Sequence, residues 1–415
     1  MAYQSSFSYD FELSYIDKNN KEYLILPEAI QYVVIDYDYD NHIMPLIYMI
    51  GNIEANLYQR MKDNQFKGKV QFSLFKINKY GTSRTRTRYI SDLFDYFIKD
   101  DPNPTKDLDK MVDGKGQAFK KCVVGLVKIE LTTNNQKQFN TVYRNTNVMS
   151  IIQNATSHMK MVIEPFRFND NVTEFSVPPI STVGQFVAFV DQNYSFYGSP
   201  YCYFMDFDKT YLKSNTGKWI DAKDGKYPYI AFDVRDMSNY QSLVDGMIVD
   251  DEQMAYIVYV EKDMATLNPD RVTPNMVGSV VAVTSTGETQ QVAVDTSVIS
   301  NVTNDIANAT VIRNDNMNIA RMLASSIEQK SANLTITKAH TDHSIYTPNK
   351  EFLLSNYEDQ TQFTGRYYMA WKKEIYQRSG SEFKGLINIG MRLVSNYAMD
   401  SAKRSRDMEV DVWNG

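Results

Sequence analysis

Two histidines, His340 and His343, come closest to a metal-binding pattern in this chain, with Asp342 between them. Zinc needs ligands that converge on one point, and residues three apart on a helix can supply them. The surrounding sequence, ITKAHTDHSIYTP, instead indicates a strand that runs into a turn. On a strand, residues three apart point to opposite faces. We therefore expect no metal site here and expect both histidines to be ordinary surface residues.

Paired carboxylates occur at Asp206 and Asp208, which share one face of an expected strand. No nucleophile–base pair accompanies them, and acidic residues are common at strand ends. Segment 113–121 carries glycines and lysines but lacks the GxxxxGK[ST] spacing of a phosphate-binding loop. The sequence also has no GxSxG, HExxH or CxxC motif. We expect a protein that is not an enzyme and that holds no cofactor and no metal.

Alternating charges mark two short segments, at Arg84, Arg86 and Arg88 and at Asp36, Asp38 and Asp40. On a strand, residues two apart share a face, so each segment would present a stripe of one charge. One interpretation is a pair of solvated strand faces. A second is a pair of complementary stripes, within a subunit or between subunits, where charge sets register and partner choice. A third is nucleic-acid binding through the arginines, which the acidic surrounding chain disfavours. These six residues are the candidate interface.

The composition is that of a β-rich globular protein. The 415 residues include 29 Tyr and 21 Phe, and aromatic side chains pack well on pleated sheets. The formal net charge of -6 provides no global basic field for nucleic acid. No apolar run reaches the roughly eighteen residues that span a bilayer, and the first twenty residues lack the apolar stretch of a signal peptide. We expect synthesis in a cytoplasm and no membrane anchor.

The N-terminal part of the chain has strand patterns with one short helix. Strict alternation from Phe7 to Tyr15 predicts a half-buried antiparallel strand, and 21–26 follows as its partner. A further strand pair is expected across 30–50, kept off a central position by Pro45. The spacing of Ile53, Leu57 and Met61 predicts a short amphipathic helix.

Helical patterns then separate this part from a second β-rich part. Apolar spacing predicts helices over about 147–160 and from Val183 to Val190, the second with Ser181 or Thr182 as N-cap. Strand patterns return from 254, and residues 383–393 alternate regularly up to the charged tail.

Two segments carry a resemblance to a known family. The stretch STVGQFVAFVDQNYSFYGSPYCYFMDFD (181–208) looks like the helix-then-strand unit of phage baseplate hub proteins, also called late-control proteins. The stretches 333–355 and 363–394 are similar to the closing barrel of that family, with a Gly-x-Tyr strand at Gly365 and Tyr367. The resemblance is one of pattern and order over most of the chain.

The resemblance implies a β-rich α+β fold with two tail-tube-like β-barrels and intervening mixed α/β domains. The implied domains are a first barrel (1–145), a mixed α/β domain (146–240), a second barrel (241–398) with an inserted subdomain near 266–330, and a charged tail (399–415). It further implies a homotrimeric baseplate hub that joins the sixfold tail tube to the threefold central spike of a contractile tail.

The expected partners are further copies of the chain, the tail tube protein, the central spike protein, other baseplate proteins and the tape measure protein. DNA would meet the chain only in transit through the channel. The expected location is the virion tail baseplate, after assembly in the bacterial cytoplasm. Two alternatives stay open: another tail or baseplate component, such as a wedge or tail-completion protein, and a receptor- or carbohydrate-binding tail protein.

Overall fold

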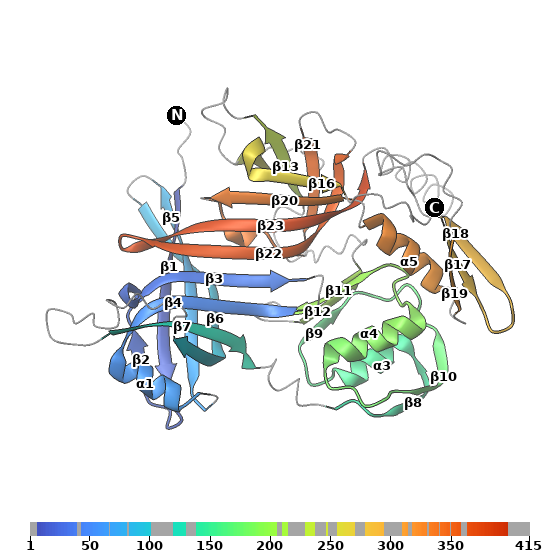
Figure 1. Ribbon diagram of the computed structural model, residues 1–415, viewed down its shortest axis with the longest axis horizontal. Coiled ribbons are helices and arrows are strands. Elements are labelled where there is room, and N and C mark those ends of the chain that lie inside the picture. The colour runs from blue at the N-terminus through green and yellow to red at the C-terminus, as the bar shows by residue number, and fades with distance from the viewer. Residues whose placement is uncertain are drawn as a thin grey trace.

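The computed structural model shows a mostly β protein with a few short helices (Figure 1). The predicted β-rich α+β class is confirmed. The structure describes residues 6–39, 43–65, 67–80, 83–100, 119–129, 138–205, 210–214, 229–236, 246–247, 255–269, 279–293, 309–313, 318–329, 332–339, 341–348, 350–357 and 363–396.

Eight strands form a closed antiparallel barrel in the order β22-β3-β4-β7-β6-β5-β1-β23, and β23 pairs with β22 to complete the ring. Their bounds are β1 (Ser6–Ile16), β3 (Ile30–Asp38), β4 (Ile43–Glu54), β5 (Lys69–Tyr80), β6 (Ser83–Asp100), β7 (Phe119–Lys128), β22 (Gly365–Ser379) and β23 (Glu382–Asn396). The short strand β2 (Glu22–Ile25) pairs with β1, as predicted, and η1 (Pro27–Ala29) leads into β3. Six barrel strands therefore come from the first third of the chain, and the C-terminal hairpin closes them.

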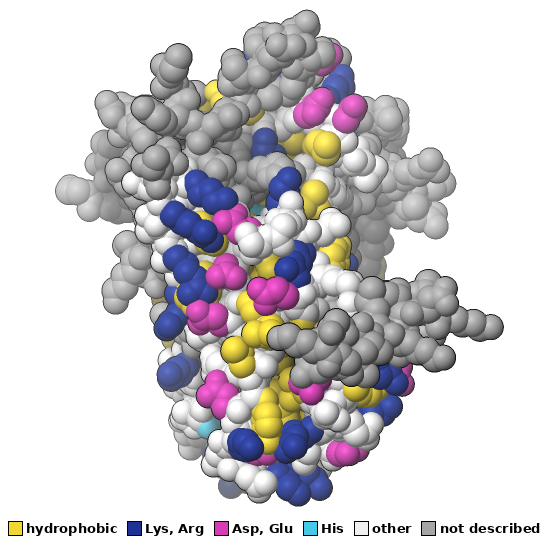
Figure 2. All heavy atoms as spheres, turned by 90° about the vertical axis from the view of Figure 1, so that its left-hand side faces the viewer, with side chains coloured by type: hydrophobic (Ala, Val, Ile, Leu, Met, Phe, Trp, Pro, Cys, Tyr) yellow, Lys and Arg dark blue, Asp and Glu magenta, His cyan; other side chains and the backbone are white. Residues whose placement is uncertain are grey.

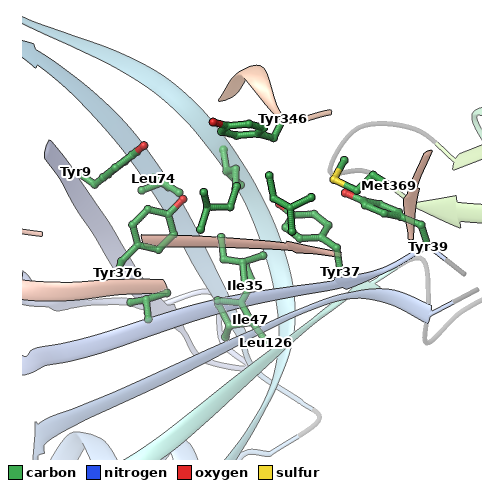
Figure 3. Close-up of a cluster of buried hydrophobic side chains, with 14 of the residues drawn as sticks. Tyr9, Ile35, Tyr37, Tyr39, Ile47, Leu74, Leu126, Tyr346, Met369 and Tyr376 are labelled. Atoms are coloured by element: carbon green, nitrogen blue, oxygen red, sulfur yellow. The ribbon is translucent and has the colours of Figure 1, made fainter. Parts of the chain in front are cut away.

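The barrel interior is filled by apolar and tyrosine side chains from every second strand position. Tyr9, Ile35, Ile47 and Leu126 are each at most 1% exposed and point into the same core (Figure 3). Burying one large apolar side chain contributes about 1.5–3 kcal/mol. Helix α1 (Ala55–Asp63) forms where predicted and adds the buried Tyr58 and Met61 to this core.

Pro45 does not keep its strand at an edge, which corrects the prediction. Strand β4 lies between β3 and β7, at a central position of the sheet. Pairing of β4 with β7 begins only at Ile47, and the register with β3 shifts between Asp36 and Asp38. Pro45 thus lies before the part of β4 that pairs with β7, at an irregularity in the pairing with β3. Its missing N–H therefore removes no hydrogen bond from a regular ladder.

Further strands extend the sheet beyond β22 and β23. On one side follow β21 (Glu351–Tyr357), β13 (Tyr229–Arg235), β15 (Ala255–Glu261) and β14 (Gly246–Met247), and on the other β20 (Ala332–Ala339) and β16 (Ala265–Pro269), after η4 (Lys262–Met264). The closed barrel and these strands share β22, β23 and one continuous core. The division into a first barrel over 1–145 and a second over 241–398 stays a prediction.

The middle of the chain has a core of its own. The elements of this middle unit are β8 (Val142–Asn147), α3 (Val148–Ala155), β9 (Met161–Ile163), β10 (Asn171–Ser176), α4 (Val183–Tyr194), β11 (Tyr201–Met205) and β12 (Thr210–Ser214). Both predicted helices are confirmed. The side chain of Asn147 caps α3 and that of Thr182 caps α4, each accepting a hydrogen bond from a backbone N–H of the first turn.

A smaller unit lies between β16 and β20 in the sequence. Strands β17 (Ser279–Val283), β18 (Thr289–Ala293) and β19 (Ala309–Arg313) form a separate sheet, and α5 (Asn318–Gln329) packs on it. Its position falls within the segment 266–330 for which the resemblance implies an insertion. No helix among the described residues is both long and apolar enough to cross a membrane.

Candidate interaction surfaces and the buried polar cluster

The three arginines of the predicted stripe lie on one exposed face of β6. Arg86 forms ion pairs with Asp10 (2.9 Å) and Glu12 (2.7 Å) of β1. Its guanidinium also lies 3.5 Å from the ring centroid of Phe75, a cation–π contact. Exposed ion pairs contribute at most about 1 kcal/mol each. These contacts therefore fix the position of Arg86 more than they stabilise the fold.

A second set of ion pairs lies where the barrel closes. Strands β1 and β23 pair at a single register position, Tyr9 with Phe383. Beside it, Glu382 of β23 accepts a hydrogen bond from Lys79 and lies 3.0 Å from Arg84. Burial raises the pKa of Glu382, but the hydrogen bond from Lys79 and the two cationic charges outweigh it and hold the pKa below its usual value. Arg84 thus joins the N-terminal strands to the C-terminal hairpin.

The aspartate stripe lies on the outer face of β3. Asp36 is opposite Lys373 of β22, at 3.7 Å, and Asp38 is opposite Trp371. Asp40 lies outside the described residues. Strands β4 and β7 separate β3 from β6, so the two stripes do not face each other within the chain. An interface role for the six residues stays a prediction.

Segment 341–348, which joins β20 to β21, lies inside the molecule. Strand β23 pairs with β1 at Phe383 and, from Leu386 onward, with β20. Its other side is occupied by β22, so β1 and β20 diverge from the same side of β23. Residues of the segment lie in the space between them: Thr341, His343 and Tyr346 are at most 1% exposed.

His343 is therefore wholly buried, which corrects the prediction of a surface histidine; His340 lies outside the described residues. The Nδ1 atom of His343 is 3.1 Å from the hydroxyl of Tyr376, and this hydroxyl donates a hydrogen bond to Glu374 at 2.8 Å. Since that hydroxyl has one proton, its oxygen accepts from Nδ1–H, and Nε2 carries the lone pair. Nε2 has no hydrogen-bond partner among the described residues. Burial lowers the pKa of His343 to about 4, so the ring is neutral at pH 7.

A buried ion pair lies beside this histidine. Lys372 and Glu374 are 2.8 Å apart, at 4% and 0% side-chain exposure. Lys372 also donates to the backbone oxygen of Tyr346 at 3.0 Å, and the Tyr89 hydroxyl donates to Glu374 at 2.8 Å. Burial raises the pKa of Glu374, but the charge and hydrogen bond of Lys372 outweigh it and hold the pKa below its usual value. Both charges are hydrogen-bonded, as buried charges must be.

The cluster ties segment 341–348 to several parts of the molecule. Lys76 of β5 lies 2.7 Å from Asp342. Lys213 of β12 donates to the backbone oxygen of Pro348, and the ring of Tyr346 stacks on Phe232 of β13 at 6.3 Å. The segment thus connects the barrel, the extended sheet and the middle unit.

The sequence signal for this cluster was present in β22. Lys372, Glu374 and Tyr376 alternate with outward-facing residues, so they occupy the face that strand periodicity assigns to the core. Three polar residues on a core face indicate a buried polar network, because charges are rarely buried without partners.

Nothing in the described part of the chain forms a group of three or more His, Cys, Asp or Glu side chains that could hold a metal. Asp206 and Asp208 lie outside the described residues. Cys122 and Cys202 are both buried, and neither is part of a disulfide. Burial raises the pKa of Cys122 to about 12, which makes its thiol a poor nucleophile.

The architecture described above, a closed barrel completed by a C-terminal hairpin with an extended sheet and an inserted α/β unit, is similar to that of solved tail proteins. The tail protein from Neisseria meningitidis MC58 superposes with a TM-score of 0.54 at 8% identity, over 92% of this chain and 96% of that chain. The 43 kDa tail protein of prophage MuSo2 from Shewanella oneidensis gives 0.51 at 10% identity, over 91% and 98%. A lidless PdpA–VgrG complex gives 0.50 at 9% identity, over 94% and 65%. At these identities the likeness is one of fold.

The sequence itself matches the family model described as Bacteriophage PBS1 gene 109 protein over residues 3–393, and the chain belongs to this family. The comparison with curated protein sequences gives no match. The predicted likeness to phage baseplate proteins is confirmed. Family and fold together support a structural role in a phage tail or baseplate.

Proposed function

We propose that this chain is the baseplate hub subunit that joins the sixfold tail tube to the threefold central spike of a contractile phage tail. The observation that carries the proposal is the extent of the likeness to the Neisseria tail protein, over 92% of this chain and 96% of that one. Little of the chain is left for a separate catalytic or receptor-binding domain.

Symmetry gives the physical reason for such an adaptor. Contacts between unlike surfaces close into a ring only at a fixed subunit number, so a threefold spike and a sixfold tube do not match directly. A trimer resolves the mismatch if each chain offers two similar surfaces. In this proposal the barrel would offer one of these surfaces, and the strands that extend the sheet beyond β22 and β23 would offer the other. Their common strands would hold both units in a fixed relative orientation.

The proposed partners are two further copies of the chain, the tail tube protein, the central spike protein, other baseplate proteins and the tape measure protein. The PdpA–VgrG neighbour is, by its name, part of a complex between two proteins, which agrees with a role in assembly. The proposed role is non-enzymatic. DNA would only pass through the ring, and assembly would take place in the bacterial cytoplasm.

Light scattering coupled to size exclusion tests this proposal, with the chain alone and with the tube and spike proteins of the same virion. A mass of three chains, and a complex that contains both partners, support the hub. A chain that stays monomeric or forms hexamers with both partners present, and binds neither, would instead favour a wedge or tail-completion protein.

A further inference from the structure

Segment 341–348 is held in the molecule by side chains of other elements. Its own backbone hydrogen bonds close turns within the segment, as from the N–H of Tyr346 to the oxygen of His343 at 3.3 Å. Among the described residues, no backbone hydrogen bond joins it to a strand of the sheet. The segment can therefore leave its place without breaking any strand pairing.

The side chains that hold the segment come from five different strands. They are Tyr9 on β1, Lys76 on β5, Tyr89 on β6, Lys213 on β12 and Lys372 on β22. Tyr9 makes two of the contacts, because its hydroxyl meets the backbone of both Thr341 and His343. Figure 3 shows Tyr346 of the segment in the same buried cluster as Tyr9 and Tyr376. The segment is thus attached at single points and not along a strand edge.

The His343 ring has no acceptor for a second ring proton. The ring edge formed by Cε1 and Nε2 faces Gly385 of β23, where an added Cβ would lie 2.6 Å and 2.8 Å from these two atoms. A methyl group does not fit there, and a water molecule is of similar size. Nε2 also has no hydrogen-bond partner among the described residues. A proton added to Nε2 would therefore meet no acceptor in this position.

Ionisable groups surround the other sides of the His343 ring. They are Tyr9, Lys76, Tyr89, Asp342, Lys372, Glu374 and Tyr376. Burial has the largest effect and lowers the pKa of His343 to about 4; the charges of Glu374 and Asp342 act against it, and that of Lys372 acts with it. The site therefore accepts the neutral ring and disfavours the charged one.

Protonation changes what the ring requires. An imidazolium has two N–H donors, whereas the site offers one acceptor, the hydroxyl of Tyr376. A buried charged donor without a partner is strongly unfavourable. The backbone N–H of His343 is itself bonded inside the core, to Tyr9, so the ring reaches water only when the segment moves outward with it.

We propose that segment 341–348 is an acid-released plug, which leaves the gap between β1 and β20 when His343 takes up a proton, while the barrel itself stays folded. Strands β1 and β23 pair at one register position, so the plug fills a place where the sheet is not continuous. Once it has left, the extended sheet is joined to the barrel through the shared strands β22 and β23. The inference concerns the fold and does not depend on the proposed function.

The expected size of the effect follows from the two environments of His343. Its pKa is about 4 in the buried position and takes the ordinary value of 6.5 once the ring is in water. The released state therefore binds the proton more tightly, and release is favoured as the pH falls from 6.5 towards 4. The equilibrium constant for release should rise about 20-fold from pH 7 to pH 5.

Most carboxyl groups stay charged over that interval, because their ordinary pKa values are about 4. Figure 2 shows acidic groups among Lys and Arg side chains on the left-hand side of the molecule, and nearby cations lower the pKa of a carboxyl group further. Asp191, whose pKa is raised by burial, lies on α4 in the middle unit. His158, the other histidine within the described residues, is exposed. A loss of protection in segment 341–348 between pH 7 and pH 5 is therefore the signature of His343.

Hydrogen exchange read by mass spectrometry at pH 7 and pH 5, corrected for the pH dependence of the intrinsic exchange rate, tests the proposal. In the wild type, peptides that cover 341–348 should lose about 20-fold in protection, whereas peptides from β3 and β22 should not change. His343→Gln has no charge at either pH, so its segment should exchange equally at both. The matched control is Asp342→Asn, which removes the neighbouring charge, keeps His343 and should retain the pH dependence of the wild type.

Three results would overturn the inference. Equal protection of 341–348 at both pH values in the wild type means that acid does not release the segment. An equal loss of protection in β3 and β22 means that the whole molecule unfolds and no plug leaves by itself. A His343→Gln variant that keeps the pH dependence assigns the trigger to another group. If this variant does not fold, the comparison of peptides in the wild type and in Asp342→Asn decides.

Discussion

Replacing Gly385 with alanine tests how tightly segment 341–348 is packed into the molecule. A Cβ at this position would lie 2.6 Å from Cε1 of His343 and 2.6 Å from Cε2 of Tyr9. Both side chains are at most 1% exposed. The Tyr9 hydroxyl donates to the backbone oxygen of Thr341 at 3.2 Å and accepts from the backbone N–H of His343 at 3.1 Å. The ring of Tyr9 cannot move away without breaking these bonds.

The expected cost follows from the same contacts. Forcing an extra carbon into a well-packed core costs about 1–3 kcal/mol. A shift of the imidazole also lengthens its 3.1 Å contact with the Tyr376 hydroxyl, and a lost hydrogen bond costs about 1 kcal/mol. The Gly385→Ala variant should therefore lose about 2–4 kcal/mol of the free energy of unfolding.

Urea unfolding followed by circular dichroism measures this loss, with Gly184→Ala as the matched control. A Cβ on Gly184 would lie 3.5 Å from the ring of Tyr203, an ordinary contact. Alanine is also favoured over glycine in a helix by up to about 1 kcal/mol, so the control should be neutral or slightly stabilising. If Gly385→Ala unfolds at the same urea concentration as the control, segment 341–348 is not packed as described.

Three further predictions concern buried ionisable groups. The pKa of His343 in the folded protein, about 4, lies below its ordinary 6.5, so the unfolded chain takes up the proton first. Stability should fall by about 3 kcal/mol as the pH drops through that window, and a His343→Gln variant with the same thermal pH profile as the wild type would contradict this. Burial raises the pKa of Asp191 from 3.8 to about 7, so its effect on stability has the opposite pH dependence. Its contribution to the free energy of unfolding is fully present below pH 3.8 and is lost as the pH rises through 7. Asp191→Asn should flatten that loss in denaturation midpoints at pH 4 and pH 8, and an unchanged slope would count against it. Glu374→Gln leaves the buried charge of Lys372 without its partner, so the free energy of unfolding measured in urea should fall by about 3–5 kcal/mol. A loss below about 1 kcal/mol, which is typical of exposed ion pairs, would contradict this prediction.

Local patterns in the sequence were sufficient to predict individual strands and helices. Strict alternation predicted β1, and the apolar spacing after a cap at Ser181 or Thr182 predicted α4. Both features depend on neighbouring residues, which the sequence displays directly. The resemblance in pattern and order likewise led to phage baseplate proteins, and the family match over residues 3–393 agrees with it.

Long-range pairings could not be predicted in the same way. Closure of the barrel depends on β22 pairing with β3, more than 300 residues away in the sequence, and no local pattern specifies that partner. The surface interpretation of His343 failed for the same reason, because the gap that buries it is formed by β1 and β20 together. The arginine stripe lay on one face as predicted, but its partners Asp10, Glu12 and Glu382 became visible only once the strands were aligned.

The central claim is that three copies of this chain form a ring between the tail tube and the central spike. Electron cryomicroscopy of the virion tail, with threefold averaging of the region where the tube meets the spike, tests it most directly. The account predicts three copies of the barrel and its extended sheet around the channel, in contact with the tube on one side and the spike on the other. Density for this chain only at the periphery of the baseplate, or in six copies away from the axis, would contradict it.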